Sequence, residues 1–156
     1  MSKLIYNQLA NHKKFNKSVK FGLKRIKIAL GLLGHPEKKL KNVINVIGES
    51  GKFTTLFSLK SFIEASNQNV TTHISPSLRD IRERFYMGEK YLSHKEIKKT
   101  IKQIEKLNIP LTVFECLTLV YIINASKINV DYNIQETGAL WRLDSNNIHD
   151  LSLIHI

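Results

Sequence analysis

Cysteine is almost absent from this chain, since Cys116 is the only one among 156 residues. A lone cysteine cannot form an internal disulfide, which excludes the disulfide-stapled secreted domains and favours a reducing cytoplasm. Long apolar runs are lacking too, because none approaches the ~20 residues that a helix needs to span a bilayer. The N-terminus has no continuous apolar stretch of the signal-peptide kind. These absences predict a cytoplasmic protein with no membrane partner.

Acidic residues are also scarce, with 13 Asp and Glu against 24 Lys and Arg, so the formal net charge is +11. A surplus of this kind is typical of nucleic-acid-binding proteins. However, the excess is nearly all lysine, it is scattered along the chain, and there is no Arg/aromatic stripe that could stack bases. The chain is also rich in Ile and Asn, which share AT-rich codons with Lys. We therefore expect no nucleic-acid partner and attribute the charge to genome composition.

Hydrophobic residues make up 42% of the chain, and their spacing alternates between strand and helix patterns. A β-branched run at 43–47, a glycine turn, an apolar stripe at 56–63 and a second run at 70–74 form a βαβ unit, which implies a parallel sheet. Residues 75–92 are predicted to be a long functional loop. Further helices are expected at 23–33, at 93–107 with a capping box at its start, and at 112–125, and a third strand at 131–135.

The strongest chemical signal lies between the first predicted strand and the following helix, where the chain reads G-E-S-G-K-F-T. A glycine turn there lets backbone N–H groups and a helix N-terminus point at phosphate oxygens, while a lysine adds charge and a threonine a hydroxyl. The standard P-loop, G-x-x-x-x-G-K-[ST], does not fit, because Phe53 separates the lysine from the threonine. A plain glycine turn with an exposed lysine is the alternative. The candidate phosphate-binding residues are Gly48, Glu49, Ser50, Gly51, Lys52, Phe53 and Thr54.

Several further motifs resemble those of one enzyme family, in the family's order and spacing. The loop is similar to G-T-N-G-K-G-[ST]. The other matches are FGLKRI at 21–26 with G-L-x-R-[IV], ISPSL at 74–78 with T-S-P-H-L, RERF at 82–85 with N-E-R-I, FECLT at 114–118 with F-E-x-x-T, and ETGALWRLDSNN at 136–147 with E-V-G-L-G-G-R-L-D-A-T-N. From about Phe21 to Asn147 the chain thus resembles the folylpolyglutamate synthase/dihydrofolate synthase family of the Mur ligase superfamily.

This resemblance implies an α/β fold with a P-loop-type parallel sheet and flanking helices, like the central domain of Mur ligases. It implies ATP and Mg²⁺ as cofactors, with residues 48–54 holding the ATP phosphates and Lys52 as the catalytic charge. Ser75 and Glu136 would ligate Mg²⁺, which takes hard oxygen ligands and few protein groups. Without the family, Ser75 is a turn residue before a proline and Glu136 a solvated carboxylate at a strand end.

The resemblance also assigns the other end of the site. Lys20, Phe21, Glu115 and Thr118 would lie near the pterin or pteroate. Asn147, with Arg142 and Asp144, would shape a nucleotide-side loop. Without the family, Glu115 is a helix-start carboxylate favoured by the helix dipole, and the other loop is a polar turn. The sequence departs from the family at Lys20, Glu49, Ser50, Phe53 and Ser77, and at Leu140 and Trp141.

The implied activity is that of an ATP-dependent ligase that joins L-glutamate to dihydropteroate or folate through an acyl phosphate, in a family that is usually monomeric. The chain lacks the family's remaining Mg²⁺-ligating histidine, its modified lysine and its glutamate-binding domain, so we expect the chain alone to make no folate conjugate. Another Mur-type amide ligase and a non-enzymatic nucleotide-binding protein are the alternatives. Only 47 residues precede Gly48, which argues against a Mur ligase with a separate N-terminal substrate domain.

The last six residues stand apart. Residues 151–156, LSLIHI, can be back-translated as CTG TCT CTT ATA CAC ATC, the end sequence of a transposon used to prepare sequencing libraries. We therefore expect them to be adapter read-through that truncates the true protein. The predicted organisation is a polar N-terminal segment at 1–17, an incomplete ATP-binding domain at 18–150 and the artefactual tail at 151–156.

Overall fold

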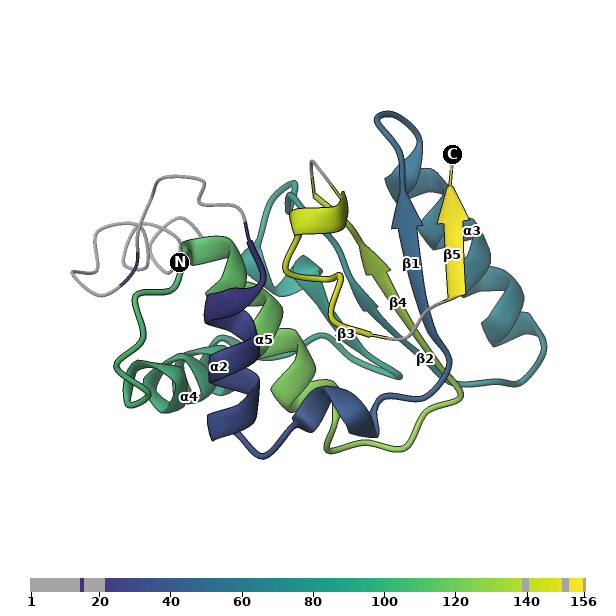
Figure 1. Cartoon of the computed structure of the whole chain (residues 1–156). Helices are drawn as coiled ribbons and strands as arrows, with labels where there is room; N and C mark the ends of the chain where they lie inside the picture. Colours follow the sequence, from purple (N-terminus) through teal and green to yellow (C-terminus); the bar gives the residue numbers. More distant parts are fainter. Residues whose placement is uncertain (1–14, 16–21, 139–140, 150–151, 156) are drawn as a thin grey trace.

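The sheet lies in the middle of the molecule with helices on both faces (Figure 1). The computed structural model describes residues 15, 22–138, 141–149 and 152–155. Five strands follow the order β3-β2-β4-β1-β5. All neighbouring pairs are parallel except β2 and β3, which are antiparallel. The strands are β1 (Val43–Ile47), β2 (Val70–His73), β3 (Phe85–Met87), β4 (Tyr132–Glu136) and β5 (Ser152–His155).

Helix α3 (Lys52–Ala65) covers one face of the sheet, and α2 (Lys24–Leu32), α4 (His94–Glu105) and α5 (Val113–Ala125) lie on the other side (Figure 1). Short 3-10 turns occur at η1 (Pro36–Lys39), η2 (Ile81–Arg84) and η3 (Trp141–Leu143). None of the helices in the described part of the chain is long and apolar enough to cross a bilayer.

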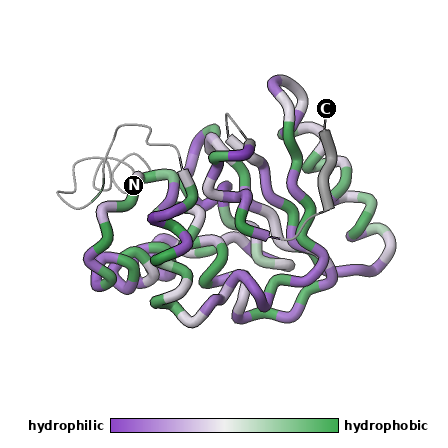
Figure 2. Tube along the Cα trace, viewed as in Figure 1, coloured by the Kyte–Doolittle hydropathy of each residue, from purple (hydrophilic) through white to green (hydrophobic). Residues whose placement is uncertain are grey.

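The hydrophobic core is divided by the sheet. One cluster joins α3 to the sheet through Val46, Leu56 and Ile134, all of which are buried. The larger cluster joins α2, α4 and α5 to β3, and its centre is α5, which is buried on nearly every side. By contrast, hydrophobic and hydrophilic residues alternate along α4, which buries only one face (Figure 2). The two clusters satisfy the requirement that both faces of a parallel sheet be covered.

Most elements predicted from the sequence are confirmed. The first strand matches β1 residue for residue, and the other two predicted strands match β2 and β4 within one residue at each end. Ser93 caps α4 in a capping box with Glu96, and Thr112 caps α5 in the same way with Glu115. Both helices therefore begin where the local sequence satisfies their first backbone N–H groups.

The prediction of a loop over 75–92 is wrong in part, because η2 and β3 lie within it. β3 is only three residues long and pairs antiparallel with the edge of β2, through Thr71 with Met87 and His73 with Phe85. Such a short strand has no periodicity to detect, so pairing with the edge of β2 decides its conformation.

Strand β5 was not predicted. It pairs with β1 in parallel, from Ile44 opposite Ser152 to Ile47 opposite His155. The free edge of a sheet accepts any extended segment through its backbone groups. This pairing therefore says nothing about the origin of residues 151–156, and their assignment to adapter read-through stays a prediction, as do the proposed segment boundaries.

Candidate functional site

The predicted phosphate loop joins the end of β1, a strand inside the sheet, to the first turn of α3. Gly51 caps α3 with a φ of 79°, a left-handed conformation that favours glycine. The ammonium of Lys52 donates to the carbonyl oxygens of Gly48 at 2.7 Å and Glu49 at 3.2 Å. The lysine thus folds back over the turn and holds a positive charge at the helix N-terminus.

The N-terminus of α3 is open to an anion. Its N-cap residue, Gly51, has no side chain to accept a hydrogen bond, and its first turn carries no acidic residue. Its first backbone N–H groups therefore have no partner within the helix and carry the positive end of the helix dipole. Glu49, the acidic departure in the loop, is exposed and contributes only its carbonyl to the contact with Lys52.

Ser75 and Glu136, the two predicted metal ligands, are brought together by the structure. Ser75 lies just beyond β2 and Glu136 ends β4, and these two strands are parallel neighbours. The backbone N–H of Ser75 donates to Oε2 of Glu136 at 2.9 Å. Burial raises the pKa of Glu136, while the Ser75 N–H and the charges of Lys52 and Arg84 oppose that rise. The carboxylate is therefore close enough to the phosphate loop to interact with its lysine.

A hydroxyl and a carboxylate are hard oxygen donors of the kind that Mg²⁺ binds, and Mg²⁺ needs few protein ligands when phosphates and water supply the rest. Within the described residues there is no cluster of three or more His, Cys, Asp or Glu that could hold a metal by itself. The donor set thus fits a cation shared with a nucleotide better than a closed protein cage.

Arg84 belongs to this site but was not singled out as a site residue from the sequence. Its Nη1 donates to the Ser75 hydroxyl at 3.2 Å, and only 6% of the residue is exposed. The RERF motif was the only signal that pointed to it. The fold places Arg84 beside Ser75 because the chain reverses at η2, and β3 then runs antiparallel to β2.

The predicted substrate end is only partly described. Glu115 is buried at the start of α5, where it completes the cap and pairs with the guanidinium of Arg25 at 3.0 Å. This arrangement confirms its interpretation as a helix-start carboxylate. The Thr118 hydroxyl lies 2.8 Å from the hydroxyl of Ser145. Lys20 and Phe21 lie outside the described residues.

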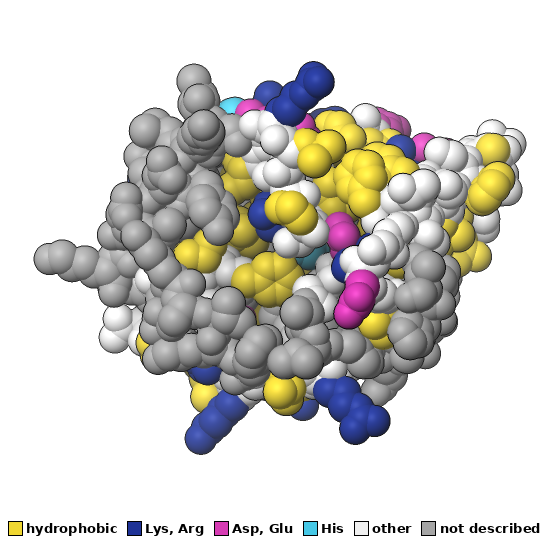
Figure 3. Space-filling view, turned by 90° about the horizontal axis from the view of Figure 1, so that it is seen from above, with side chains coloured by type: hydrophobic (Ala, Val, Ile, Leu, Met, Phe, Trp, Pro, Cys, Tyr) yellow, Lys and Arg dark blue, Asp and Glu magenta, His cyan; other side chains and the backbone are white. Residues whose placement is uncertain are grey.

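The segment after β4 folds around a buried carboxylate. Asp144 accepts from the backbone N–H of Gly138 at 3.0 Å and of Asn146 at 2.9 Å. Burial raises the pKa of Asp144 to about 6, against these two hydrogen bonds. Asn147, a predicted nucleotide contact, donates to the carbonyl of Arg142 at 3.2 Å within the same segment. Figure 3 looks onto this end of the sheet, where acidic and basic side chains lie beside hydrophobic ones.

Comparison with known proteins decides the family. No family model matches the chain. The dihydrofolate synthase/folylpolyglutamate synthase of Bacillus subtilis is 31% identical over 146 residues, which cover 88% of this chain and 34% of that protein. E. coli FolC in complex with DHPP and ADP superposes with a TM-score of 0.89 at 29% identity, over 98% of this chain and 37% of that one. The chain belongs to the dihydrofolate synthase/folylpolyglutamate synthase family. It spans about one third of the length of these relatives.

Solved members of the dihydrofolate synthase/folylpolyglutamate synthase family bind the ligands that this site suggests. A bifunctional folylpolyglutamate synthase/dihydrofolate synthase with Mn, AMPPNP and L-glutamate bound has a TM-score of 0.85 and 30% identity, over 97% of this chain and 36% of that one. A divalent metal and a nucleotide are therefore used within the family.

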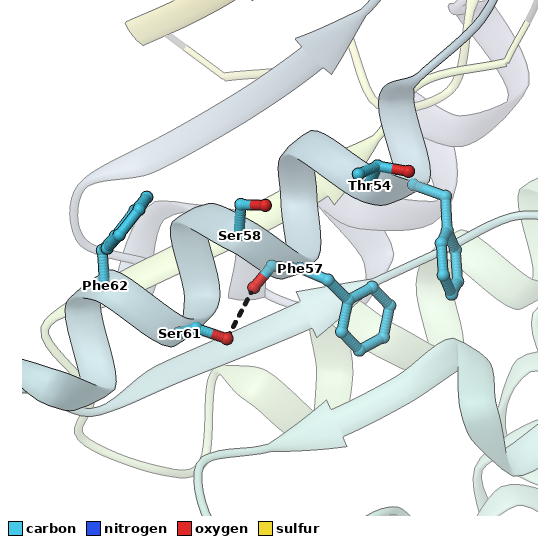
Figure 4. Close-up of a pocket in the computed structure, with 6 residues that line it drawn as sticks. Thr54, Phe57, Ser58, Ser61 and Phe62 are labelled. Carbon is cyan, nitrogen blue, oxygen red and sulfur yellow. Dashed lines mark hydrogen bonds between the residues drawn. The ribbon is translucent and has the colours of Figure 1, made fainter.

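One departure from the family's loop motif has a structural explanation. Phe53, which replaces a glycine, packs its ring against Phe57 with centroids 4.5 Å apart. The bulk of Phe53 therefore lies along α3. These two rings line an open groove of about 420 Å³ on the outer side of the helix, together with Thr54, Ser58, Ser61 and Phe62 (Figure 4).

A row of buried polar side chains crosses the sheet beneath the site and was not recognised from the sequence. His73, Gln135 and Asn45 occupy matching positions on β2, β4 and β1, and each is 0% exposed. His73 lies between the rings of Phe85 and Tyr121, and burial lowers its pKa to about 3. This imidazole is therefore neutral at physiological pH. Strand periodicity predicts burial at these positions but not which polar partners meet.

Proposed function

We propose that this chain forms the nucleotide-binding part of an ATP-dependent carbon–nitrogen ligase of folate biosynthesis, which joins L-glutamate to dihydropteroate or a folate. One observation carries the proposal: the loop at the N-terminus of α3, the charge of Lys52 and the Ser75–Glu136 pair lie at one end of the sheet, linked by the 2.9 Å contact. In open α/β sheets this carboxyl end of the strands is where ligands bind.

The proposed reaction has two steps. The γ-phosphoryl group of ATP passes to the carboxylate of the pteroate or folate, which gives ADP and an acyl phosphate. The amino group of L-glutamate then attacks the acyl carbon, phosphate leaves, and an amide forms. Phosphoryl transfer depends chiefly on positioning and charge neutralisation, so the chain needs few reactive groups.

Residues of this chain have defined parts in the first step. The N–H groups of residues 48–54 and the α3 dipole bind phosphate oxygens, and Lys52 moves its ammonium from the loop carbonyls to the outer phosphates. Ser75 and Glu136 would hold Mg²⁺, which would neutralise charge on the phosphates. Asn147 is proposed to shape the nucleotide side of the site.

The acid substrate is proposed to lie toward α5. Thr118 is proposed to border this end from within the core: it is 0% exposed, and its hydroxyl lies 2.8 Å from that of Ser145. Lys20, Phe21 and Glu115 are proposed to border the same end, with Glu115 acting through its pair with Arg25.

Binding of tripolyphosphate and of AMPPNP with Mg²⁺, measured by calorimetry on the chain, tests the nucleotide site. We expect Lys52→Met to weaken both by at least ~10-fold, because charge-assisted contacts to phosphate are worth ~1.5–3 kcal/mol. Lys98→Met is the matched control, since Lys98 is an exposed lysine on α4. Equal losses from both variants, or no binding by the folded wild-type chain, would refute the site.

The full reaction is tested by glutamate incorporation into dihydropteroate and folates. We expect none by the purified chain alone, because it spans only about one third of the length of its relatives. Incorporation above background would overturn that expectation. A rise in melting temperature with Mg-AMPPNP but no ligase activity in any longer form would instead favour a non-enzymatic nucleotide-binding protein.

A further inference from the structure

The groove on the outer side of α3 is lined by two rows of side chains. Residues four apart lie above one another on a helix. One row is therefore Phe53, Phe57 and Ser61, and the other is Thr54, Ser58 and Phe62 (Figure 4). The groove starts at the second residue of the helix, directly after Lys52. It therefore begins beside the phosphate loop.

Two aromatic rings form the part of the groove nearest to that loop. Phe53 is 39% exposed, and its ring centroid lies 4.5 Å from that of Phe57. Phe57 is half-buried and packs against the apolar cluster under α3, which supports the exposed ring. Exposed aromatic faces of this kind stack with flat π systems such as nucleic-acid bases. The family's loop motif has glycine at this position, so the ring of Phe53 is a feature of this chain itself.

Charge is distributed unevenly along this side of α3. The helix start carries the positive end of the helix dipole and the ammonium of Lys52, whereas none of the side chains that line the groove is charged. A ligand that fits both parts is anionic at one end and flat and uncharged at the other. A nucleotide has this form, because its phosphates carry the charge and its base is an aromatic heterocycle.

The size of the groove favours a small molecule over a protein partner. Pockets for small ligands typically have volumes of ~300–1,000 Å³, and this groove has a volume of about 420 Å³. A stable protein–protein interface takes ~20–30 residues from each side, whereas 6 residues line the groove.

We propose that the base of the nucleotide whose phosphates bind the loop stacks on the ring of Phe53 in this groove. This inference rests on the proposed function. Phe57 supports the ring from below, and Ser58 offers a hydroxyl that can donate to or accept from the polar edge of the base. Phe53 thus adds affinity for the base and none for the phosphates.

Calorimetry with two ligands tests this assignment, because AMPPNP carries a base and tripolyphosphate does not. Both are titrated with Mg²⁺. We expect Phe53→Ala to weaken AMPPNP binding by at least ~5-fold, which corresponds to ~1 kcal/mol, the lower end of what stacking of a base on an aromatic ring contributes. The same variant should bind tripolyphosphate as the wild type does, because the loop and Lys52 are unchanged.

Phe62→Ala is the matched control, since Phe62 lines the far end of the same groove and is 71% exposed. It should change neither affinity. Phe53→Tyr keeps an aromatic ring and should bind AMPPNP as the wild type does. If Phe53→Ala does not fold, Phe53→Trp provides another readout: AMPPNP should quench the emission added to that of Trp141, the only natural tryptophan, and tripolyphosphate should not. A folded Phe53→Trp chain without this quenching would overturn the proposal.

The two ligands also separate this inference from the proposed function. A loss of AMPPNP affinity confined to Phe53→Ala, with tripolyphosphate binding kept, supports stacking of the base. Three results overturn stacking but leave the phosphate site standing: equal AMPPNP affinity in the wild type and Phe53→Ala, an equal loss of both ligands in that variant, or an equal effect of Phe62→Ala. No tripolyphosphate binding by the folded wild type overturns the proposed function as well.

Discussion

The face of the sheet under α3 and the face under α5 are lined by different kinds of side chain. Under α3, Ile44, Ile134 and Val46 pack against buried Leu56, and buried Thr72 is the polar residue at the matching position beside Ile134. Under α5, the side chains at matching positions on β2, β4 and β1 are polar except for Val43: Thr71, Asn133, His73, Gln135 and Asn45. Apolar side chains are stabilised by burial when their shapes fit together, whereas buried polar groups cost free energy unless each has a hydrogen-bond partner.

Part of the polar face obtains its partners from distant parts of the chain, whereas Asn45 Oδ1, His73 Nε2 and Gln135 Oε1 have no hydrogen-bond partner among the described residues. Thr71 bonds both the hydroxyl of Tyr121 and the amide of Asn133 at 2.7 Å. Gln135 contacts His149 at 3.0 Å, and Asn146 donates to the carbonyl of Glu136 at 2.9 Å. The segment that carries Asp144 is thereby tied to the strand that carries Glu136. The α3 face therefore supplies stability, while the α5 face fixes the geometry beside the site.

The largest expected effect lies on the apolar face. Leu56→Ala should lower the free energy of unfolding by ~2–5 kcal/mol, because it leaves a cavity between α3 and the sheet. Urea denaturation measures this. Phe62→Ala on the same helix is the control, since Phe62 is 71% exposed and should change stability by no more than ~0.5 kcal/mol. Equal losses would contradict the packing of α3 described above.

An intermediate effect, dependent on pH, is expected on the polar face. The pKa of His73 is lowered from 6.5 to about 3, so the unfolded chain binds the proton that the folded chain excludes. Stability from this group is therefore complete above pH 6.5 and is lost as the pH falls toward 3. Between pH 7.5 and pH 5 the loss is ~2 kcal/mol.

His73→Phe keeps a ring between Phe85 and Tyr121 but removes the titration. The free energy of unfolding of this variant, minus that of the wild type, should rise by ~2 kcal/mol from pH 7.5 to pH 5. Asp144, whose pKa is raised to about 6, contributes with the opposite sign, because its stability is lost as the pH rises. That contribution is common to both proteins and cancels in the difference. A difference that does not change with pH would show that His73 has the same pKa in the folded and the unfolded chain.

The smallest effect is expected for a single hydroxyl. Tyr121→Phe removes the 2.7 Å bond to Thr71, while Thr71 keeps its bond to Asn133, so we expect a loss of ~1 kcal/mol. A cycle with Thr71→Val and the double variant isolates the coupling between the two hydroxyls. Tyr91→Phe, at an exposed tyrosine, should be nearly neutral. If no coupling is measured, the buried hydrogen bond between Tyr121 and Thr71 contributes less to stability than its length suggests.

The sequence was most informative where local chemistry decides structure. The run at 43–47 is β-branched, and the cap at Ser93 lies within four residues of the group it satisfies. The glycine turn before Lys52 was likewise readable, because a left-handed residue and a helix start are local events. The prediction that Ser75 and Glu136 meet came from the family resemblance, and their contact is seen between neighbouring strands.

Features that depend on contacts across the fold could not be read in this way. The strand at Phe85–Met87 forms because β2 offers an edge, and Arg84 reaches Ser75 because the chain reverses between them. The partners of His73 come from β3 and from α5, 12 and 48 residues away in sequence at Phe85 and Tyr121. Periodicity gives the face on which a side chain lies, whereas the identity of its neighbour depends on topology.

The position of Cys116 gives the molecule a built-in reporter of its own opening. It is the only cysteine in the chain and lies at 0% exposure within α5, where burial raises the pKa of its thiol. A thiol that is both inaccessible and protonated does not react. A thiol-specific reagent therefore modifies only molecules in which α5 has separated from its neighbours, so the labelling rate measures how often the layer over the polar face comes apart.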